Sequence, residues 1–106
     1  MWAQLISTKL KDGVEDRVPE LMERLRSIEQ PGSGLIRSTA MRDQNDPSRL
    51  LLLVVFGSED DARAREADPR RQEGLKDVRA LMAEMFAGPP EFTDLTVVHE
   101  TGGHSE

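Results

Sequence analysis

The sequence predicts an α+β protein in which two helices pack on one face of a four-stranded antiparallel sheet. Three observations support this prediction. Four short segments have the apolar pattern of strands, two longer segments carry apolar stripes at helical spacing, and turn-forming residues separate all six. The resulting order, β-α-β-β-α-β, is the ferredoxin-like or split β-α-β arrangement.

The first strand and the first helix are predicted within residues 2–28. Trp2 to Leu10 alternates roughly and contains β-branched and aromatic residues, as is typical of a strand. After the turn KDG, an apolar stripe typical of an amphipathic helix follows, formed by Val14, Val18, Leu21, Met22, Leu25 and Ile28. Because proline disrupts a helix interior, we expect the helix to begin near Asp16, with Pro19 in its first turn.

Two strand-like segments, residues 34–43 and 49–56, come next and are joined by the sequence DQNDPS. Asp, Asn, Pro and Ser favour turns, so the pair is predicted to form a hairpin with a loop of about six residues. The second of these strands is apolar at every position from Leu50 to Phe56. Since a strand with one solvated face should alternate, both faces of this strand are predicted to be dry.

The second helical segment is predicted to break near Asp68–Pro69. Ser58 stands in the N-cap position before an acidic first turn, and Asp68–Pro69 is typical of a second cap followed by a proline. An apolar stripe follows, formed by Leu75, Val78, Leu81, Met82, Met85 and Phe86. The sequence GPP at 88–90 ends the helix, and residues 91–99 form the last strand. We expect one domain over 1–100 and a flexible tail over 101–106.

Composition excludes several classes of protein. The chain has 106 residues, enough for a core without disulfides, and no cysteine that could act as a nucleophile or bind zinc. Its net charge of −6, without a concentrated basic face, makes nucleic acid an unexpected partner. The longest apolar run is too short to cross a bilayer, and the first residues lack the pattern of a secretory signal. We therefore expect no membrane partner and a cytoplasmic location.

The uniformly apolar third strand predicts a homodimer. In the ferredoxin-like order this strand is central, so its face away from the helices needs a cover. A second copy of the same face would provide that cover through a two-fold interface. The alternative is that loops or the tail of the same chain cover it.

Several features resemble one known family. The β-α-β-β-α-β order, the turn PGSG and the sequence VVFGSEDDARAREADPRRQEGL are similar to the dimeric α/β-barrel proteins of the antibiotic biosynthesis monooxygenase type. Where that family often has WxSxExA, this chain has Phe56, Gly57, Ser58, Glu59 and Asp60. The resemblance covers nearly the whole chain and implies a dimeric α/β barrel. Its motifs are structural, and family members include cofactor-free oxygenases and haem-degrading enzymes.

The haem-degrading branch implies residues that this chain lacks. That branch has a tryptophan and a later haem-ligating histidine on the helix, where a gap-free alignment places Arg65 and Leu75. Leucine has no lone pair with which to bind iron. His99, at the end of the last predicted strand, and His104, in the tail, have no partners at metal-ligand spacing. We therefore expect neither a cofactor nor a metal ion.

Candidate ligand-binding residues are the large or polar side chains predicted to face a pocket between the sheet and the helices. They are Trp2, Gln4, Arg37, Ser38, Phe56, Arg71, Met82 and Phe86. The oxygenase branch uses tryptophan, tyrosine, asparagine and histidine, but this chain has no tyrosine, and its Asn45 lies in the hairpin loop. No catalytic residue is assigned. The alternative is that the large apolar residues belong to an ordinary core.

Among these candidates, Arg37 has the clearest chemistry. Strict alternation puts it on the same side of its strand as Leu35 and Thr39. There its guanidinium could hold a carboxylate or enolate oxygen in forked hydrogen bonds. It could equally form an ion pair with Asp94 or with a glutamate.

The four arginines beyond the third strand are predicted to form a solvated and paired helix face. Three of them follow an acidic residue by four positions, the favourable direction for a pair on a helix. These pairs are Glu59–Arg63, Asp61–Arg65 and Glu66–Arg70. Arg71 has no such partner, and we expect it near a pocket mouth.

Two functions remain open from the sequence. The resemblance implies a cofactor-independent monooxygenase that acts on a small aromatic or polyketide-like compound. The missing tyrosine favours a non-catalytic small-molecule-binding or accessory dimer on the same scaffold. Whether the protein is an enzyme is not decided by its sequence.

Overall fold

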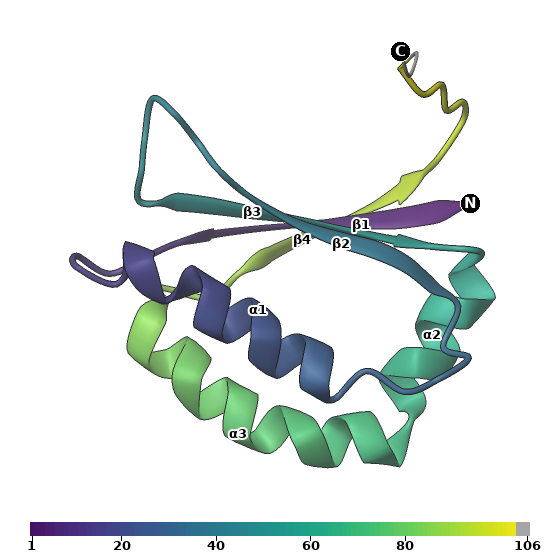
Figure 1. The fold of residues 1–106 in the computed structure, drawn as a ribbon, viewed down its shortest axis with the longest axis horizontal. Coiled ribbons are helices and arrows are strands. Elements are labelled where there is room, and N and C mark those ends of the chain that lie inside the picture. Colours follow the sequence, from purple (N-terminus) through teal and green to yellow (C-terminus); the bar gives the residue numbers. More distant parts are fainter. Residues whose placement is uncertain (104–106) are drawn as a thin grey trace.

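The computed structural model describes residues 1–103, in which the elements follow the predicted order (Figure 1). The strands are β1 (Trp2–Lys9), β2 (Leu35–Arg42), β3 (Arg49–Phe56) and β4 (Glu91–Thr96). The helices are the short 3-10 helix η1 (Glu15–Arg17), α1 (Val18–Ser27), α2 (Glu59–Ala67) and α3 (Pro69–Met85). Part of the tail expected over 101–106, including His104, lies outside the described residues.

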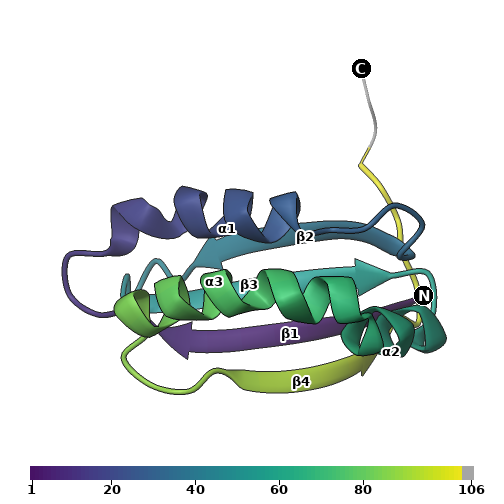
Figure 2. The same cartoon turned by 90° about the horizontal axis from the view of Figure 1, so that it is seen from below.

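The four strands form one antiparallel sheet in the order β2-β3-β1-β4. Figures 1 and 2 show α1 and α3 lying along one face of this sheet, which we call the helix side; we call the other face the open face. The α+β ferredoxin-like class is therefore confirmed, and β3 is a central strand as predicted. No helix among residues 1–103 is both long and apolar enough to span a membrane.

Two apolar clusters divide the helix side into two ends. The main core joins α1 and α3 to β1 and β3, and its buried members are Leu10, Leu21, Leu50, Leu52, Val78, Leu81 and Met85. A smaller cluster lies beside α2 and is formed by Trp2, Val54, Phe56 and Ala62. The main core therefore anchors the two long helices, whereas the smaller cluster holds α2 at the far end of β1 and β3.

The helix boundaries follow the caps predicted from the sequence. Ser58 Oγ accepts a hydrogen bond from the backbone amide of Asp61 at 3.1 Å, which starts α2. The side chain of Asp68 accepts one from the amide of Arg70 at 2.9 Å, which starts α3. The predicted break at Asp68–Pro69 is confirmed. Pro19 lies in the first turn of α1, also as predicted.

The last strand is shorter than predicted. β4 ends at Thr96, which lies opposite Trp2, and only the amide of Val97 still bonds to the carbonyl of Met1, at 3.3 Å. Beyond that point β1 has no residue left to pair with, so the chain leaves the sheet. His99 consequently lies beyond β4 rather than at its end, and its side chain is exposed.

A β-bulge corrects the predicted facing of β2. The register shifts between Leu35 and Arg37, so that Leu35 lies opposite Phe56 whereas Arg37 lies opposite Val55. Leu35 packs against the smaller cluster on the helix side, and Arg37 points to the open face with Thr39. Strict alternation was therefore wrong for Leu35, because the bulge adds one residue to β2 at this point.

The segment after β4 covers one end of the open face. Arg37 Nη2 donates to Glu100 Oε1 at 2.8 Å. In the register, Val55 and Ala3 lie in the same row of the sheet as Arg37, and they are 3% and 4% exposed. The ion pair lies over part of this row, so the segment between β4 and Glu100 provides part of the cover that β3 requires. The rest of the face keeps Leu51 and Leu53 only half-buried.

Candidate functional site

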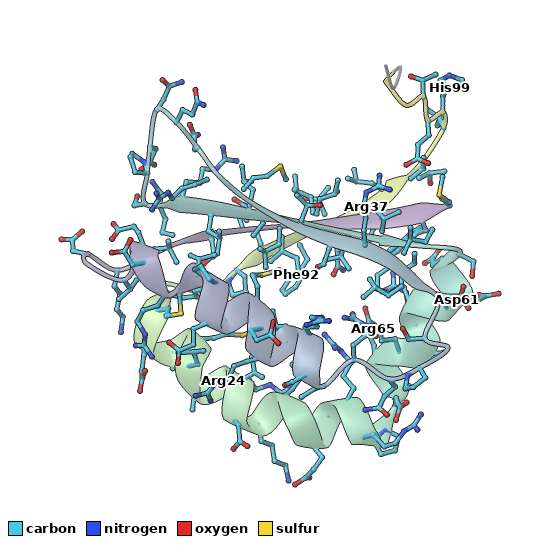
Figure 3. All side chains as sticks on the ribbon, viewed as in Figure 1. Arg24, Arg37, Asp61, Arg65, Phe92 and His99 are labelled. Atoms are coloured by element: carbon cyan, nitrogen blue, oxygen red, sulfur yellow. The ribbon has the colours of Figure 1, made fainter. Side chains whose placement is uncertain are left out.

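The eight candidate residues do not converge on a single place. Four of them lie at the α2 end of the helix side or border it: Trp2, Gln4, Phe56 and Arg71. Met82 and Phe86 pack against the main core at the opposite end. Arg37 points to the open face, and Ser38 is an exposed residue of the sheet-edge strand β2. Figure 3 shows Arg37 and Arg65 on opposite sides of the sheet.

Trp2 and Phe56 form the aromatic part of the α2 end. Their ring centroids are 6.0 Å apart, and the rings are tilted by 50°. The guanidinium of Arg63 lies 5.0 Å from the centroid of Trp2, and that of Arg65 lies 5.1 Å from the centroid of Phe56. Cation–π contacts of this kind hold a guanidinium by its face and leave the N–H groups on its edge available.

A polar chain continues from this aromatic pair to β4. The amide of Gln4 donates to Asp94 Oδ1 at 3.0 Å, and Arg63 Nη2 donates to Asp94 Oδ2 at 2.9 Å. These two donors, Gln4 first, lower the pKa of Asp94 below its ordinary value. Arg63 also pairs with Glu59 at 3.2 Å, as predicted. Asp94 is therefore not the partner of Arg37, which pairs instead with a glutamate.

Arg65 points inward and forms an ion pair with Glu29. Glu29 follows Ile28, the C-cap residue of α1. Arg65 Nε donates to both carboxylate oxygens at 3.0 Å, and its Nη2 donates to Oε1 at 2.7 Å. The Arg65 side chain is only 14% exposed and that of Glu29 only 19%. Figure 3 shows Arg65 between the sheet and the helices. The predicted pair of Asp61 with Arg65 is replaced by this longer-range one.

Helix geometry explains why the predicted solvated arginine face is wrong in part. Residues two apart on a helix point about 200° apart, so Arg63 and Arg65 cannot both face solvent. Arg63 and Arg70 are 43% and 67% exposed, whereas Arg71 is 13% exposed. Arg70 bonds to the capping Asp68 at 2.8 Å rather than to Glu66. Two of the four arginines are thus solvated, and Arg65 and Arg71 are largely sheltered from solvent.

Arg71 is largely sheltered from solvent, and one of its hydrogen-bond donors has no partner in the described part of the chain. Its Nη1 is shielded from solvent and has no hydrogen-bond partner among residues 1–103; Glu29 Oε1 lies 3.8 Å away. Burial, and next the positive charge of Arg65, lower the pKa of Arg71 to about 10, so it stays charged at neutral pH. Burial alone would raise the pKa of Glu29, but hydrogen bonds led by that from Arg65 lower it below its ordinary value.

A pocket of about 150 Å³ opens beside these charges. It lies between the loop at 29–33 and the junction of α2 and α3, and its charged lining residues are Glu29, Asp61, Arg65, Asp68, Arg70 and Arg71. A second pocket, of about 360 Å³, lies at the opposite end, where the start of α1 approaches β2 and β3. None of the eight candidate residues lines the second pocket, whereas Arg71 lines the first. The first pocket is therefore the candidate ligand site.

Sequence reasoning missed Glu29, Arg63, Arg65 and Asp94 as members of this site. Glu29 and Arg65 are 36 residues apart, and no local spacing rule links them. The available signal was the helical phase of the four arginines, which places Arg63 and Arg65 on different sides of α2. Among residues 1–103, no group of three or more His, Asp or Glu side chains is placed to hold a metal ion.

No protein-family model matches the chain, and no curated protein matches its sequence. Solved structures nevertheless share its fold. A Bordetella bronchiseptica protein provisionally assigned as an antibiotic biosynthesis monooxygenase is 21% identical, with a TM-score of 0.73 over 92% of this chain and 97% of that one. SnoaB, a cofactor-independent oxygenase from Streptomyces nogalater, is 17% identical, with a TM-score of 0.69 over 93% of this chain and 94% of SnoaB.

A third similar structure shows the limits of fold as a guide to function. The Nitrosomonas europaea protein NE2512, of unknown function, is 15% identical, with a TM-score of 0.71 over 98% of this chain and 95% of that one. The chain therefore has the ferredoxin-like fold of the antibiotic biosynthesis monooxygenase structures. Since one fold carries many activities, its function has to be argued from the site.

Proposed function

We propose that the protein binds a small aromatic or polyketide-like compound at the α2 end of the helix side. The observation that carries this proposal is the stack of Arg65 on Phe56 beside the pocket at 29–33. A guanidinium can stack with aromatic groups on both of its faces. A planar ligand that enters the pocket would thus lie on Arg65 without displacing Phe56, while convergent polar groups would set its orientation.

Cofactor-independent oxidation of that compound is the second candidate function. It is favoured by the fold shared with SnoaB, which is described as a cofactor-independent oxygenase. Such chemistry needs a group that removes a proton from the substrate. Glu29 is poorly suited to this task, because Arg65 occupies its carboxylate and the pKa of Glu29 is lowered. Binding is therefore the primary proposal.

The single tryptophan of the chain makes binding directly measurable. Trp2 contacts Phe56 and Arg63, so its fluorescence should change saturably when hydroxylated aromatic compounds are titrated into the protein. Replacing Phe56 by Leu should weaken binding, whereas replacing Phe86 by Leu, at the other end of the molecule, should not. Equal effects of the two substitutions, in variants whose circular dichroism shows a folded chain, would refute the proposed location.

Oxygen uptake separates the two candidate functions. A compound that binds is incubated with the metal-free protein in an oxygen electrode cell, and its products are analysed by mass spectrometry. Protein-dependent oxygen consumption together with an oxygenated product would establish the second candidate. Saturable binding without turnover would leave the binding role.

We further propose that the protein is a homodimer that buries its open face. Leu5, Leu51 and Leu53 are half-buried there, and Met41 and Leu95 are 40% and 37% exposed. A second copy of this face would cover them, because a two-fold interface pairs like with like. Among residues 1–103 these side chains stay partly exposed, which supports a partner.

Two adjacent leucines of β3 test the dimer. Leu53→Asp places a charge on the open face and should yield a folded monomer, whereas Leu52→Asp places it in the main core and should unfold the chain. Sedimentation velocity and circular dichroism measure both effects. A wild-type protein that sediments as a monomer at micromolar concentration would refute the dimer.

A further inference from the structure

The donors of Arg71 require a partner that residues 1–103 do not supply. Its Nη1 lacks a hydrogen-bond acceptor, and the 3.8 Å separation from Glu29 Oε1 is too long for a hydrogen bond. Buried polar groups in folded proteins are almost always hydrogen-bonded, so an exception calls for an explanation. Arg71 also lines the pocket, so a group with a lone pair that reaches its guanidinium there would supply an acceptor.

The charges around Glu29 do not balance locally. Arg65 and Arg71 flank one carboxylate, and Arg65 already forms three hydrogen bonds with it. Each of the three side chains is less than a fifth exposed, so together they hold an excess of one positive charge in a place sheltered from water. An additional monoanion would remove that excess.

The other charged residues of the pocket lining do not supply the missing negative charge. Asp68 accepts two hydrogen bonds from the side chain of Arg70, at 3.1 and 2.8 Å, which closes that pair. Asp61 also lines the pocket but is packed against Gly34, where an added Cβ would come within 2.4 Å of its Cγ, and it forms no ion pair with Arg71 among residues 1–103. Glu29 and Glu66 act on Arg71 through their charges alone, without a hydrogen bond among residues 1–103, so the unpartnered donor remains at Arg71.

We propose that this pocket binds the oxyanion of a ligand on Arg71, with Glu29 and Arg65 as its fixed support. A carboxylate or phosphate group matches the flat fork of a guanidinium. The volume of about 150 Å³ suits such a group with a few further atoms rather than a whole drug-sized compound. This inference rests on the proposed function, since it states the chemical class of the ligand: an aromatic compound that carries a small acidic group.

A matched pair of probes tests the oxyanion requirement. 4-Hydroxybenzoate and 4-hydroxybenzamide have the same ring and differ in charge, and Trp2 fluorescence reports their binding. We expect the acid to bind about tenfold to a hundredfold more tightly, the range for hydrogen bonds to a charged group. Arg71→Met should abolish this preference. Arg26→Met also removes one positive charge, but from an exposed pair with Glu23 outside the pocket lining, and should retain the preference.

Simple anions separate a failure of this inference from a failure of the proposed function. Acetate and inorganic phosphate are titrated alone, and chemical shifts of Arg71 and Gly32, which both line the pocket, report binding. The comparison also shows whether carboxylate or phosphate is preferred. The inference would be overturned if 4-hydroxybenzoate and 4-hydroxybenzamide bound equally, or if the preference for the acid survived Arg71→Met. The proposed binding of aromatic compounds would still stand in either case. If neither aromatic probe binds but acetate or phosphate does so through Arg71, the oxyanion site stands and the proposed function fails. No binding of any probe would overturn both.

Thermal melts of the same variants exclude a purely structural role for Arg71. If Arg71 serves only to neutralise Glu29, Arg71→Met should lower the melting temperature and leave the acid preference intact. That result would also overturn the inference. We expect the opposite pattern, because methionine keeps much of the side-chain volume and removes a poorly partnered buried charge.

Discussion

The two ends of the helix side differ in what they bury. At the main-core end, Leu21 and Met85 are completely buried among other apolar side chains. At the α2 end, Glu29, Arg65 and Arg71 lie sheltered beside the aromatic pair. Buried ion pairs contribute little net stability, because desolvation opposes their attraction. We infer that the main core carries the stability of the fold and that the α2 end is specialised for recognition.

The largest effect expected from this comparison is at the main core. Replacing Leu21 by Ala removes three carbons from a site with no exposed surface and should lower the free energy of unfolding by about 2 to 5 kcal/mol. Urea denaturation followed by circular dichroism measures the loss. Val98→Ala, at a side chain that is 92% exposed, serves as the control and should change little. Comparable losses in both variants would contradict the assignment of stability to this end.

A smaller loss is expected from Glu29→Gln at the α2 end. The change leaves two sheltered arginines without a charged partner, and hydrogen bonds to a charged group contribute about 1.5 to 3 kcal/mol. Glu73→Gln, in an exposed pair with Lys76, is the matched control. The free energy of unfolding at neutral pH measures both. If the free energy of unfolding of Glu29→Gln equals that of the wild type, the two arginines do not depend on the charge of Glu29 for stability.

The same variant should change how stability depends on pH. The pKa of Glu29 is lower in the folded protein than its ordinary value of about 4.3. Its contribution is therefore fully present above that value and is lost as the pH falls through it toward the folded pKa. The difference in unfolding free energy between wild type and Glu29→Gln should stay nearly constant from neutral pH down to about pH 5 and shrink as the pH falls below about 4.3. A difference that grows on acidification would contradict this assignment.

An intermediate effect is expected at the start of α2. Ser58→Ala removes the acceptor for the Asp61 amide and should reduce stability by about 0.5 to 2 kcal/mol. Because α2 carries Arg63 and Arg65, faster hydrogen exchange in its first turn should accompany the loss. Ser27→Ala, which removes a hydroxyl that donates to the Arg24 carbonyl, is the control, with a smaller expected change. Unchanged exchange in α2 would show that tertiary contacts alone hold the helix.

The smallest effect is expected from Arg37→Met. Arg37 pairs with Glu100 on the open face, and both side chains are about half exposed, 51% and 41%. Exposed pairs contribute at most about 1 kcal/mol, less at high salt, so the melting temperature should fall slightly and only at low salt. Binding of phenolic acids should not change. A variant with weakened ligand binding would bring Arg37 into the site and break the contrast between the two ends.

Local patterns were sufficient for the elements of this fold. The apolar run from Leu50 to Phe56, the caps at Ser58 and Asp68 and the stripe of α1 each depend on neighbours a few residues away. Local patterns gave wrong predictions where a strand departs from the regular two-residue alternation or loses its partner strand. The bulge after Leu35 reversed the side on which that residue lies, and β4 ended where its partner strand ran out.

The candidate site was only partly predictable for a different reason. Trp2, Gln4, Phe56 and Arg71 could be singled out because large or polar side chains at strand ends and after caps are recognisable in sequence. Their partners could not, since Glu29 meets Arg65 across 36 residues and Asp94 meets Gln4 across 90. Contacts at such separations depend on how the elements pack.

The sequence by itself determined the order of elements, the place of the helix break and the central position of the third strand, because propensity, capping and periodicity act over a few residues. Only the tertiary structure decided which arginines are buried. α2 packs against α3 and the end of β3, and its helical phase sends Arg65 to Glu29 and Arg63 to Asp94, while α3 carries Arg71 into the same sheltered pocket. Burial and charge balance are properties of packed elements, and they are what gives this fold a candidate site.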